Sequence, residues 1–187
     1  EITWPKAPTD ASPRLLGTDL EMNHPVERER GLVLPVQVYP MFETAIRAAA
    51  GRSPEDHLVR ISELWSRFSA VAADNPKAWI REAKTAEEIR TVGADNRMVG
   101  LPYPKYMNSN NDVDMGAAII MCSLEAARRL GVPEDRWVFP HSGADCHEHK
   151  FVSNRDTFAR TPAIELGGKA ALELAAVAID DVAIVDL

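Results

Sequence analysis

Apolar positions at helical spacing predict that the first half of the chain is helical. The clearest helix is expected to begin after Ser53, which can cap it, and to carry Pro54 in its first turn. Its apolar face consists of Leu58, Ile61, Leu64, Trp65, Phe68, Val71 and Ala72. A shorter helix is predicted from Thr85, which begins a capping-box sequence, to about Val92.

Prolines determine which structure is predicted for the residues before this helix. Residues 1–35 contain five prolines and scattered charges, which favours an extended connector. The apolar run at 31–39 suits a short strand, although Pro35 would interrupt its hydrogen bonds. From Met41 the apolar spacing becomes helical, and Gly51 is expected to end that helix.

The second half alternates short apolar runs with amphipathic segments. Strands are predicted at 116–122, 137–139 and 182–187, and helices at 123–130 and 162–176. The first of these runs shows no alternation, which is typical of a strand buried on both faces. The order strand, helix, strand, helix, strand favours an α/β fold with a mainly parallel sheet covered by helices.

The last apolar run continues to Leu187 without a turn, a cap or a polar tail. A buried terminal strand in a complete domain would give this pattern, and so would a break inside a core strand. Because the chain also begins with Glu1 rather than a methionine, we expect it to be an internal fragment of a longer protein.

The composition excludes some classes of partner and indicates where the protein is located. The 187 residues carry a formal net charge of -7 with dispersed Lys and Arg, so neither nucleic acid nor an anionic membrane is expected as a partner. No run approaches the roughly 20 apolar residues that a membrane-spanning helix needs. Two cysteines, Cys122 and Cys146, suit a reducing compartment, and a cytoplasmic location is predicted.

The segment 141–149 concentrates imidazole, thiol and carboxylate groups, which are usual ligands of zinc. A second ligand pair is missing from the sequence, so we predict no metal site and favour a polar loop that borders a pocket. Cys146 beside His147 raises the alternative of a nucleophilic thiolate, although neighbouring side chains usually point in different directions. Cys122 is expected to be a small core residue.

A dense run of short donors and acceptors, at 108–114, precedes the first predicted strand of the second half. Such residues favour turns because they bond to their own backbone, and they also suit a loop that contacts a polar ligand. The run lacks the glycine and the downstream glutamate of a calcium loop.

Two stretches of the second half resemble the thiolase superfamily. Residues 111–131 are similar to its Asn-Asp-Gly-Ala-Ala-type strand and to the Ser-Glu-rich helix that ends in Leu-Gly. Residues 161–187 are similar to the segment whose helix and Asp-Asp-Ile strand lead into an Asn-Glu-Ala-Phe active-site loop. With Tyr39–Glu43 and Ala78–Trp79, the chain most resembles the branch of acetyl-CoA acetyltransferases and sterol-carrier-protein-X-like thiolases.

The resemblance implies a fragment of a thiolase-like α/β fold. Residues 1–106 would be a connector and a mainly helical loop region that covers the substrate, and residues 107–187 would be part of the layered α-β-α core. The implied activity is acyl transfer from acyl-CoA thioesters in lipid metabolism, with coenzyme A as a substrate and no bound cofactor. The longer protein is expected to be a homodimer or homotetramer.

The same resemblance assigns no catalytic residue to this chain. In the family, the nucleophilic cysteine comes earlier than these stretches and the catalytic histidine comes later, so the isolated chain is expected to be inactive. Six residues are expected to contact the substrate or coenzyme A, in the pantetheine channel, near the acyl pocket and in the segment 141–149. They are Asn108, Ser109, Asn110, Phe158, His141 and His147.

The segment 141–149 departs from the small apolar turn of the family, which leaves two alternatives open. One is a non-catalytic scaffold that binds acyl-CoA or a partner protein. The other is a thiolase-like carbon-carbon lyase that acts on a larger substrate.

Overall fold

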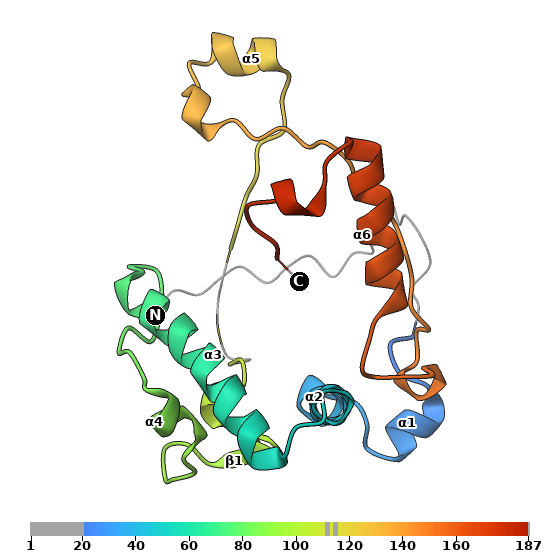
Figure 1. Ribbon diagram of the computed structural model, residues 1–187. Coiled ribbons are helices and arrows are strands. Elements are labelled where there is room, and N and C mark those ends of the chain that lie inside the picture. The colour runs from blue at the N-terminus through green and yellow to red at the C-terminus, as the bar shows by residue number, and fades with distance from the viewer. Residues whose placement is uncertain (1–20, 111–112, 114–115, 187) are drawn as a thin grey trace, which may run out of the picture.

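The computed structural model describes residues 21–110, 113 and 116–186 (Figure 1). Its helices are α1 (Pro25–Glu29), α2 (Pro35–Ala49), α3 (Pro54–Asp74), α4 (Ala86–Arg90), α5 (Leu124–Arg129) and α6 (Pro162–Ala175). Its short 3-10 helices are η1 (Lys105–Met107), η2 (Glu134–Arg136), η3 (Val152–Asn154) and η4 (Ile179–Asp181). Two antiparallel strands, β1 (Met98–Gly100) and β2 (Tyr103–Pro104), form a hairpin.

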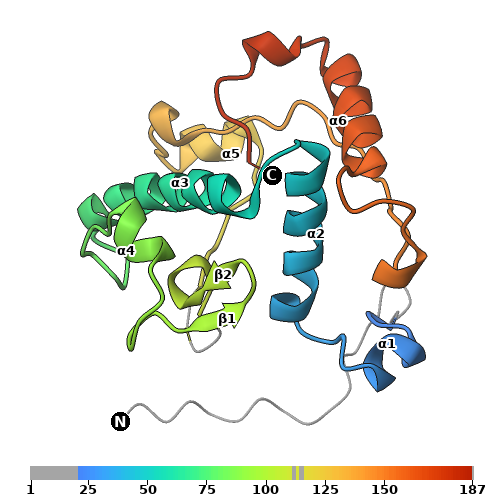
Figure 2. The ribbon, with the colours of Figure 1, turned by 60° about the horizontal axis from the view of Figure 1, so that its bottom comes forward.

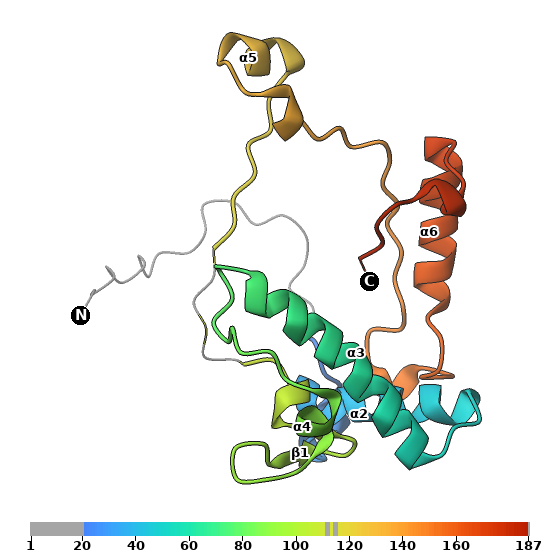
Figure 3. The same cartoon turned by 60° about the vertical axis from the view of Figure 1, so that its left-hand side comes forward.

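The helices are spread over an open arrangement. α3, α4 and the β1–β2 hairpin lie together, and α2 lies between this group and α6, as Figure 2 shows. α5 lies apart from the other helices at the end of two extended segments (Figure 3). In the described part of the chain, no helix combines the length and the apolar character that crossing a bilayer requires.

Side-chain caps begin three helices, as the sequence predicts. The hydroxyl groups of Ser53, Thr85 and Ser123 accept the third backbone N–H of α3, α4 and α5, at 3.0, 3.2 and 3.1 Å. Gly51 and Gly131 follow the ends of α2 and α5 with φ values of +65° and +67°, which glycine adopts at little cost. These three predicted helices are confirmed, as are α6 and the glycine end of α2.

α2 begins at Pro35 rather than at Met41, so the strand suggested at 31–39 is wrong. Proline has no N–H to donate, and the first helical position is one where that N–H would have no helical acceptor. The side-chain oxygen of Gln37 accepts the two N–H groups just before the helix, at 2.7 and 2.9 Å. The proline therefore starts a helix here.

The same chemistry starts α1 inside the predicted connector. Pro25 occupies its first turn, the Nδ1 atom of His24 accepts an N–H of that turn at 3.2 Å, and Glu27 accepts the N–H of His24 at 2.8 Å. The expectation of an extended connector is therefore wrong for these residues. Residues 1–20 of that connector lie outside the described residues.

The three strands predicted in the second half are wrong for the described residues. A strand needs a neighbouring backbone to complete its hydrogen bonds, and the described sheet contains only β1 and β2. Apolar side chains of these segments are therefore open to solvent: Ile119 is 99% exposed and Ile184 is 86% exposed. Cys122, expected in the core, is exposed for the same reason. Leu187, at the end of the third run, lies outside the described residues.

A small core lies where α3, α4 and η1 meet. One residue of each forms its centre, and Leu58, Tyr103 and Tyr106 pack against it. The central residues are Ile61, Ile89 and Met107, which are 7%, 2% and 5% exposed. The apolar stripe predicted for α3 therefore faces this core only in part.

Asn96 ties the loop after α4 to this core. Its Nδ2 group lies within hydrogen-bonding distance of the carbonyls of Glu88, Ile89 and Thr91, at 3.1, 2.9 and 2.9 Å. Its Oδ1 atom accepts the N–H of Tyr106 at 2.9 Å. One side chain, 4% exposed, thus satisfies carbonyls that the end of α4 leaves without helical donors.

Replacing Asn96 with alanine is expected to lower the free energy of unfolding by about 2–3 kcal/mol, because buried backbone groups would lose their partners. The urea midpoint measures this change. Asn154→Ala is the matched control, since that side chain is exposed. Equal midpoints for the two variants would contradict the role given to Asn96.

Candidate functional site

One side of α2 forms the floor of an apolar groove with a volume of about 470 Å³. Positions three and four apart on a helix share a face, and five residues of α2 line the groove in this way. Leu101 and Phe158 line it as well, and no charged side chain does. The α2 residues are Pro40, Met41, Thr44, Ala45 and Ala48.

The hairpin that carries Leu101 packs directly on α2. A Cβ atom added at Gly100 would lie 3.0 Å from the carbonyl oxygen of Val36 and 3.4 Å from Cγ of Pro40. Only a residue without a side chain permits this approach without a shift of backbone. Gly100 therefore places Leu101 at the edge of the groove.

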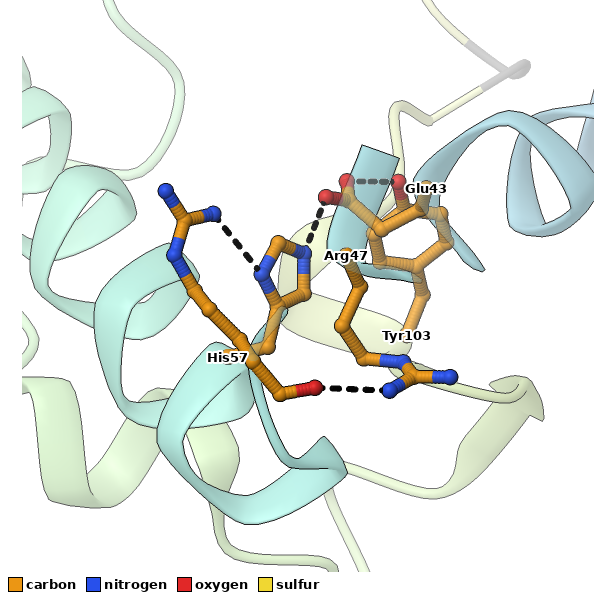
Figure 4. A network of polar contacts seen from close by, with 5 residues as sticks. Glu43, Arg47, His57 and Tyr103 are labelled. Atoms are coloured by element: carbon orange, nitrogen blue, oxygen red, sulfur yellow. Dashed lines mark hydrogen bonds and ion pairs between the residues drawn. The ribbon is translucent and has the colours of Figure 1, made fainter. Parts of the chain in front are cut away.

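A polar network holds the hairpin and α3 to α2 (Figure 4). One carboxylate oxygen of Glu43 on α2 accepts a hydrogen bond from the hydroxyl of Tyr103 on β2. The other oxygen lies 2.6 Å from Nε2 of His57 on α3. His57 is 3% exposed. Its Nδ1 atom lies 3.4 Å from Nη1 of Arg52, and Arg47 donates to the Arg52 carbonyl at 2.7 Å.

The donors around His57 assign its tautomer. A guanidinium can only donate, so the Nδ1 atom that faces Arg52 accepts, and the proton belongs on Nε2. His57 then donates to Glu43 from Nε2. The Glu43 carboxylate accepts two hydrogen bonds from two different elements, which compensates its partial burial.

Tyr103 makes this network sensitive to alkaline pH. Burial, and then the hydrogen bond to the Glu43 carboxylate, raise the pKa of Tyr103 well above its ordinary value of 10.0. The unfolded chain ionises this phenol near pH 10, whereas the folded chain keeps it protonated. The stability from Tyr103 is therefore complete below about pH 10 and is lost as the pH rises towards the folded pKa.

Tyr103→Phe is expected to lower the stability at pH 7 by about 1–2 kcal/mol, because Glu43 loses a donor. Above pH 10 the free energy of unfolding should fall less steeply in the variant than in the wild type. Urea denaturation between pH 7 and 11 tests both effects, with the 62% exposed Tyr39→Phe as control. Parallel pH profiles would rule out the assigned shift.

The loop before α6 carries Phe158 and is anchored to α1. The ring of Phe158 meets the ring of Phe42 on α2, with centroids 5.0 Å apart. Earlier in the same loop, the N–H of Ser153 donates to Oε1 of Glu27 at 2.8 Å. Glu27 is 4% exposed, and this bond joins segments far apart in the sequence.

Glu27 should respond to acid. Two hydrogen bonds from Ser153, through its side chain and through its N–H, are the main causes that lower the pKa of Glu27 below its ordinary value. The stability that Glu27 contributes is therefore present above about pH 4.5 and is lost as the pH falls towards the folded pKa.

We expect Glu27→Gln to reduce stability at pH 7 and to flatten the loss of stability between about pH 5 and pH 3. Thermal midpoints across that range measure the effect, and the exposed Glu29→Gln is the matched control. The anchor would be disproved by an unchanged midpoint at pH 7 together with an unchanged acid profile.

The structure separates the six residues predicted as substrate contacts. Phe158 lines the groove. Asn108 follows η1 and donates to the Pro104 carbonyl at 2.8 Å, while Ser109 and Asn110 are exposed beyond it. These three residues are not among those that line the groove, so their assignment stays a prediction.

The segment 141–149 lies along α6, and none of its residues lines the groove. The hydroxyl of Ser142 donates to the Ala171 carbonyl at 2.7 Å. One turn earlier in α6, a Cβ atom added at Gly167 would lie 2.6 Å from Sγ of Cys146. The small residues of α6 therefore allow the segment to lie close against the helix.

His141 and His147, the remaining two predicted contacts, are exposed in this segment. The Nε2 atom of His147 lies 3.5 Å from the exposed carboxylate of Asp145. Cys146 shows no hydrogen bond to an imidazole among the described residues. Within the same part of the chain, no three His, Cys, Asp or Glu side chains gather as metal ligands would.

Sequence reasoning missed the network of Glu43, His57 and Tyr103. A signal was present, since His57 stands one helical turn before Ile61 and therefore lies on the same apolar face of α3. A polar residue at such a position needs a buried partner. The partner could not be identified, because Glu43 and Tyr103 are distant in sequence.

Comparison with known proteins gives the class of fold. No protein-family model and no curated protein matches the chain. Among solved structures, it is similar to a monomeric SCP2-thiolase like protein type 1 from Mycobacterium smegmatis, with a TM-score of 0.78 and 37% sequence identity. The match covers 90% of this chain and 37% of that one, so the chain spans well under half of the matched protein.

The chain therefore has a thiolase-like fold. This confirms the predicted fold class, a partial thiolase-like α/β fold, although its described residues are mostly helical with one small sheet. The division into regions at residues 106 and 107 stays a prediction.

Proposed function

We propose that this chain forms the acyl-binding part of a thiolase-like acyltransferase that acts on acyl-CoA thioesters, of the acetyl-CoA acetyltransferase type. The observation that carries the proposal is the apolar groove of α2, Leu101 and Phe158 in a chain with a thiolase-like fold. Coenzyme A would enter as part of the substrate, and no bound cofactor is required.

The lining of the groove suits an acyl chain. Its seven residues offer aliphatic and aromatic surface, and Thr44 contributes the one polar side chain among them. Transfer of apolar surface out of water favours binding of a hydrocarbon chain, at about 0.8 kcal/mol for each buried CH₂ group. The groove would therefore provide affinity for the acyl part and leave the reactive carbonyl to other groups.

The two cysteines of this chain have no catalytic role in the proposed function. In acyl transfer a thiolate attacks the carbonyl carbon, and donors stabilise the oxyanion that forms. Cys122 and Cys146 are exposed, and neither contacts an imidazole base among the described residues. We accordingly expect no turnover of acetoacetyl-CoA by the chain of 187 residues alone.

The exposed thiols also favour a second candidate, a non-catalytic acyl-CoA-binding scaffold. The two candidates share the groove and differ in turnover. Acyl transfer by the protein that contains this chain separates them. A cytoplasmic location and a homodimer or homotetramer belong to the first proposal, whereas the matched Mycobacterium smegmatis protein is described as monomeric.

Phe158→Ala is expected to weaken binding of hexanoyl-CoA about fivefold, because truncation removes roughly 1 kcal/mol of apolar contact. Isothermal titration calorimetry measures the dissociation constants. The control is Phe139→Ala, which truncates a 61% exposed phenylalanine outside the groove. If the wild-type chain binds no hexanoyl-CoA, or if both variants lose affinity equally, the groove is not the acyl site.

A further inference from the structure

Arg155 differs from the other half-buried arginines of the described chain. Arg47 donates to a carbonyl, Arg52 contacts His57, and Arg90 pairs with Glu87. The side chain of Arg155 makes no hydrogen bond or ion pair with any described residue, and its Nε atom is buried without a partner. An unpartnered buried donor costs free energy, more so in a charged group.

An aromatic contact holds Arg155 next to the groove. Its guanidinium lies over the ring of Phe42, 5.3 Å from the centroid. Phe42 in turn meets Phe158, which lines the groove. The contact with Phe42 holds the cation and supplies no hydrogen-bond acceptor in the plane of the guanidinium, so the two Nη groups keep their donors for an oxyanion.

We propose that Arg155 binds a carboxylate at the far end of the acyl chain, so that the substrate class is an acyl-CoA thioester with a terminal carboxyl group. This inference rests on the proposed function of the groove. Phe158 lines the groove and contacts Phe42, whose ring carries the Arg155 guanidinium, so a chain that extends past Phe158 would approach the cation. Because the groove itself has no charged lining, the charge of Arg155 gives the site its preference.

The test compares adipoyl-CoA with hexanoyl-CoA, which have equal numbers of acyl carbons and differ in the terminal carboxylate. Binding to the full chain is measured by calorimetry. Wild type should bind adipoyl-CoA more tightly, and Arg155→Gln should weaken that binding at least tenfold, as loss of a charge-assisted pair does. Hexanoyl-CoA should bind both proteins equally. Arg155→Lys should restore part of the adipoyl-CoA affinity, and the exposed Arg160→Gln should change neither ligand.

A second arm separates the carboxylate from the phosphates of coenzyme A. Adipoyl-pantetheine has no phosphate, so Arg155→Gln should weaken its binding by the same factor as it weakens the binding of adipoyl-CoA. Equal losses for both CoA thioesters, with none for adipoyl-pantetheine, would assign Arg155 to a phosphate and overturn the proposal.

The remaining outcomes separate this inference from the proposed function. If wild type binds hexanoyl-CoA but Arg155→Gln leaves adipoyl-CoA binding unchanged, the inference fails and the acyl groove stands. If wild type binds neither CoA thioester, the proposed function fails, and the inference fails with it. Matching thermal midpoints of wild type and Arg155→Gln establish that the variant is folded.

Discussion

The candidate site depends on the carboxylate of Glu43. A carboxylate that leaves water costs free energy unless donors replace the lost hydration. Here the donors come from two other elements, His57 on α3 and Tyr103 on β2. Stabilising the charge therefore also fixes α3 and the hairpin against α2, and the hairpin carries Leu101 at the edge of the groove.

A second carboxylate, that of Glu27, fixes the loop that carries Phe158, another residue that lines the groove. Glu27 on α1 accepts the N–H of Ser153, and the loop that follows carries Phe158. The hairpin and this loop are thus each held by a carboxylate distant in sequence from the segment it fixes. Hydrogen bonds to charged groups are stronger than those between neutral groups, so both segments are placed by directional contacts rather than by apolar packing alone.

Local chemistry explains which elements could be predicted from the sequence. The starts of α3, α4 and α5 depend on a capping side chain and the next few residues, such as Ser53 and the N–H it accepts. Pro35 predicts an interrupted strand when only its missing N–H is considered, whereas in the structure it is the first residue of α2. The strands predicted for the second half do not form among the described residues, because strand pairing needs a partner that these residues do not supply.

Among the residues that line the candidate site, the sequence analysis named only Phe158. Phe158 and Asn108 came from the resemblance, and of these two only Phe158 lines the groove. His141 came from the polar segment 141–149, which departs from the family, and it does not line the groove. Arg155 carried no signal, since an isolated arginine in a polar loop is indistinguishable by sequence from a solvated one. Its lack of a partner becomes visible only after the partners of the other arginines are known.

The contrast between the groove and Arg155 has a consequence for selectivity. An apolar groove distinguishes acyl chains by length in steps of only about 1 kcal/mol for each methylene, and it discriminates poorly between similar chains. A guanidinium held on an aromatic ring distinguishes ligands by charge, because a neutral chain end leaves its donors unpaired. In this chain the two elements meet through Phe42 and Phe158, so the groove would provide affinity and Arg155 would provide the choice of substrate.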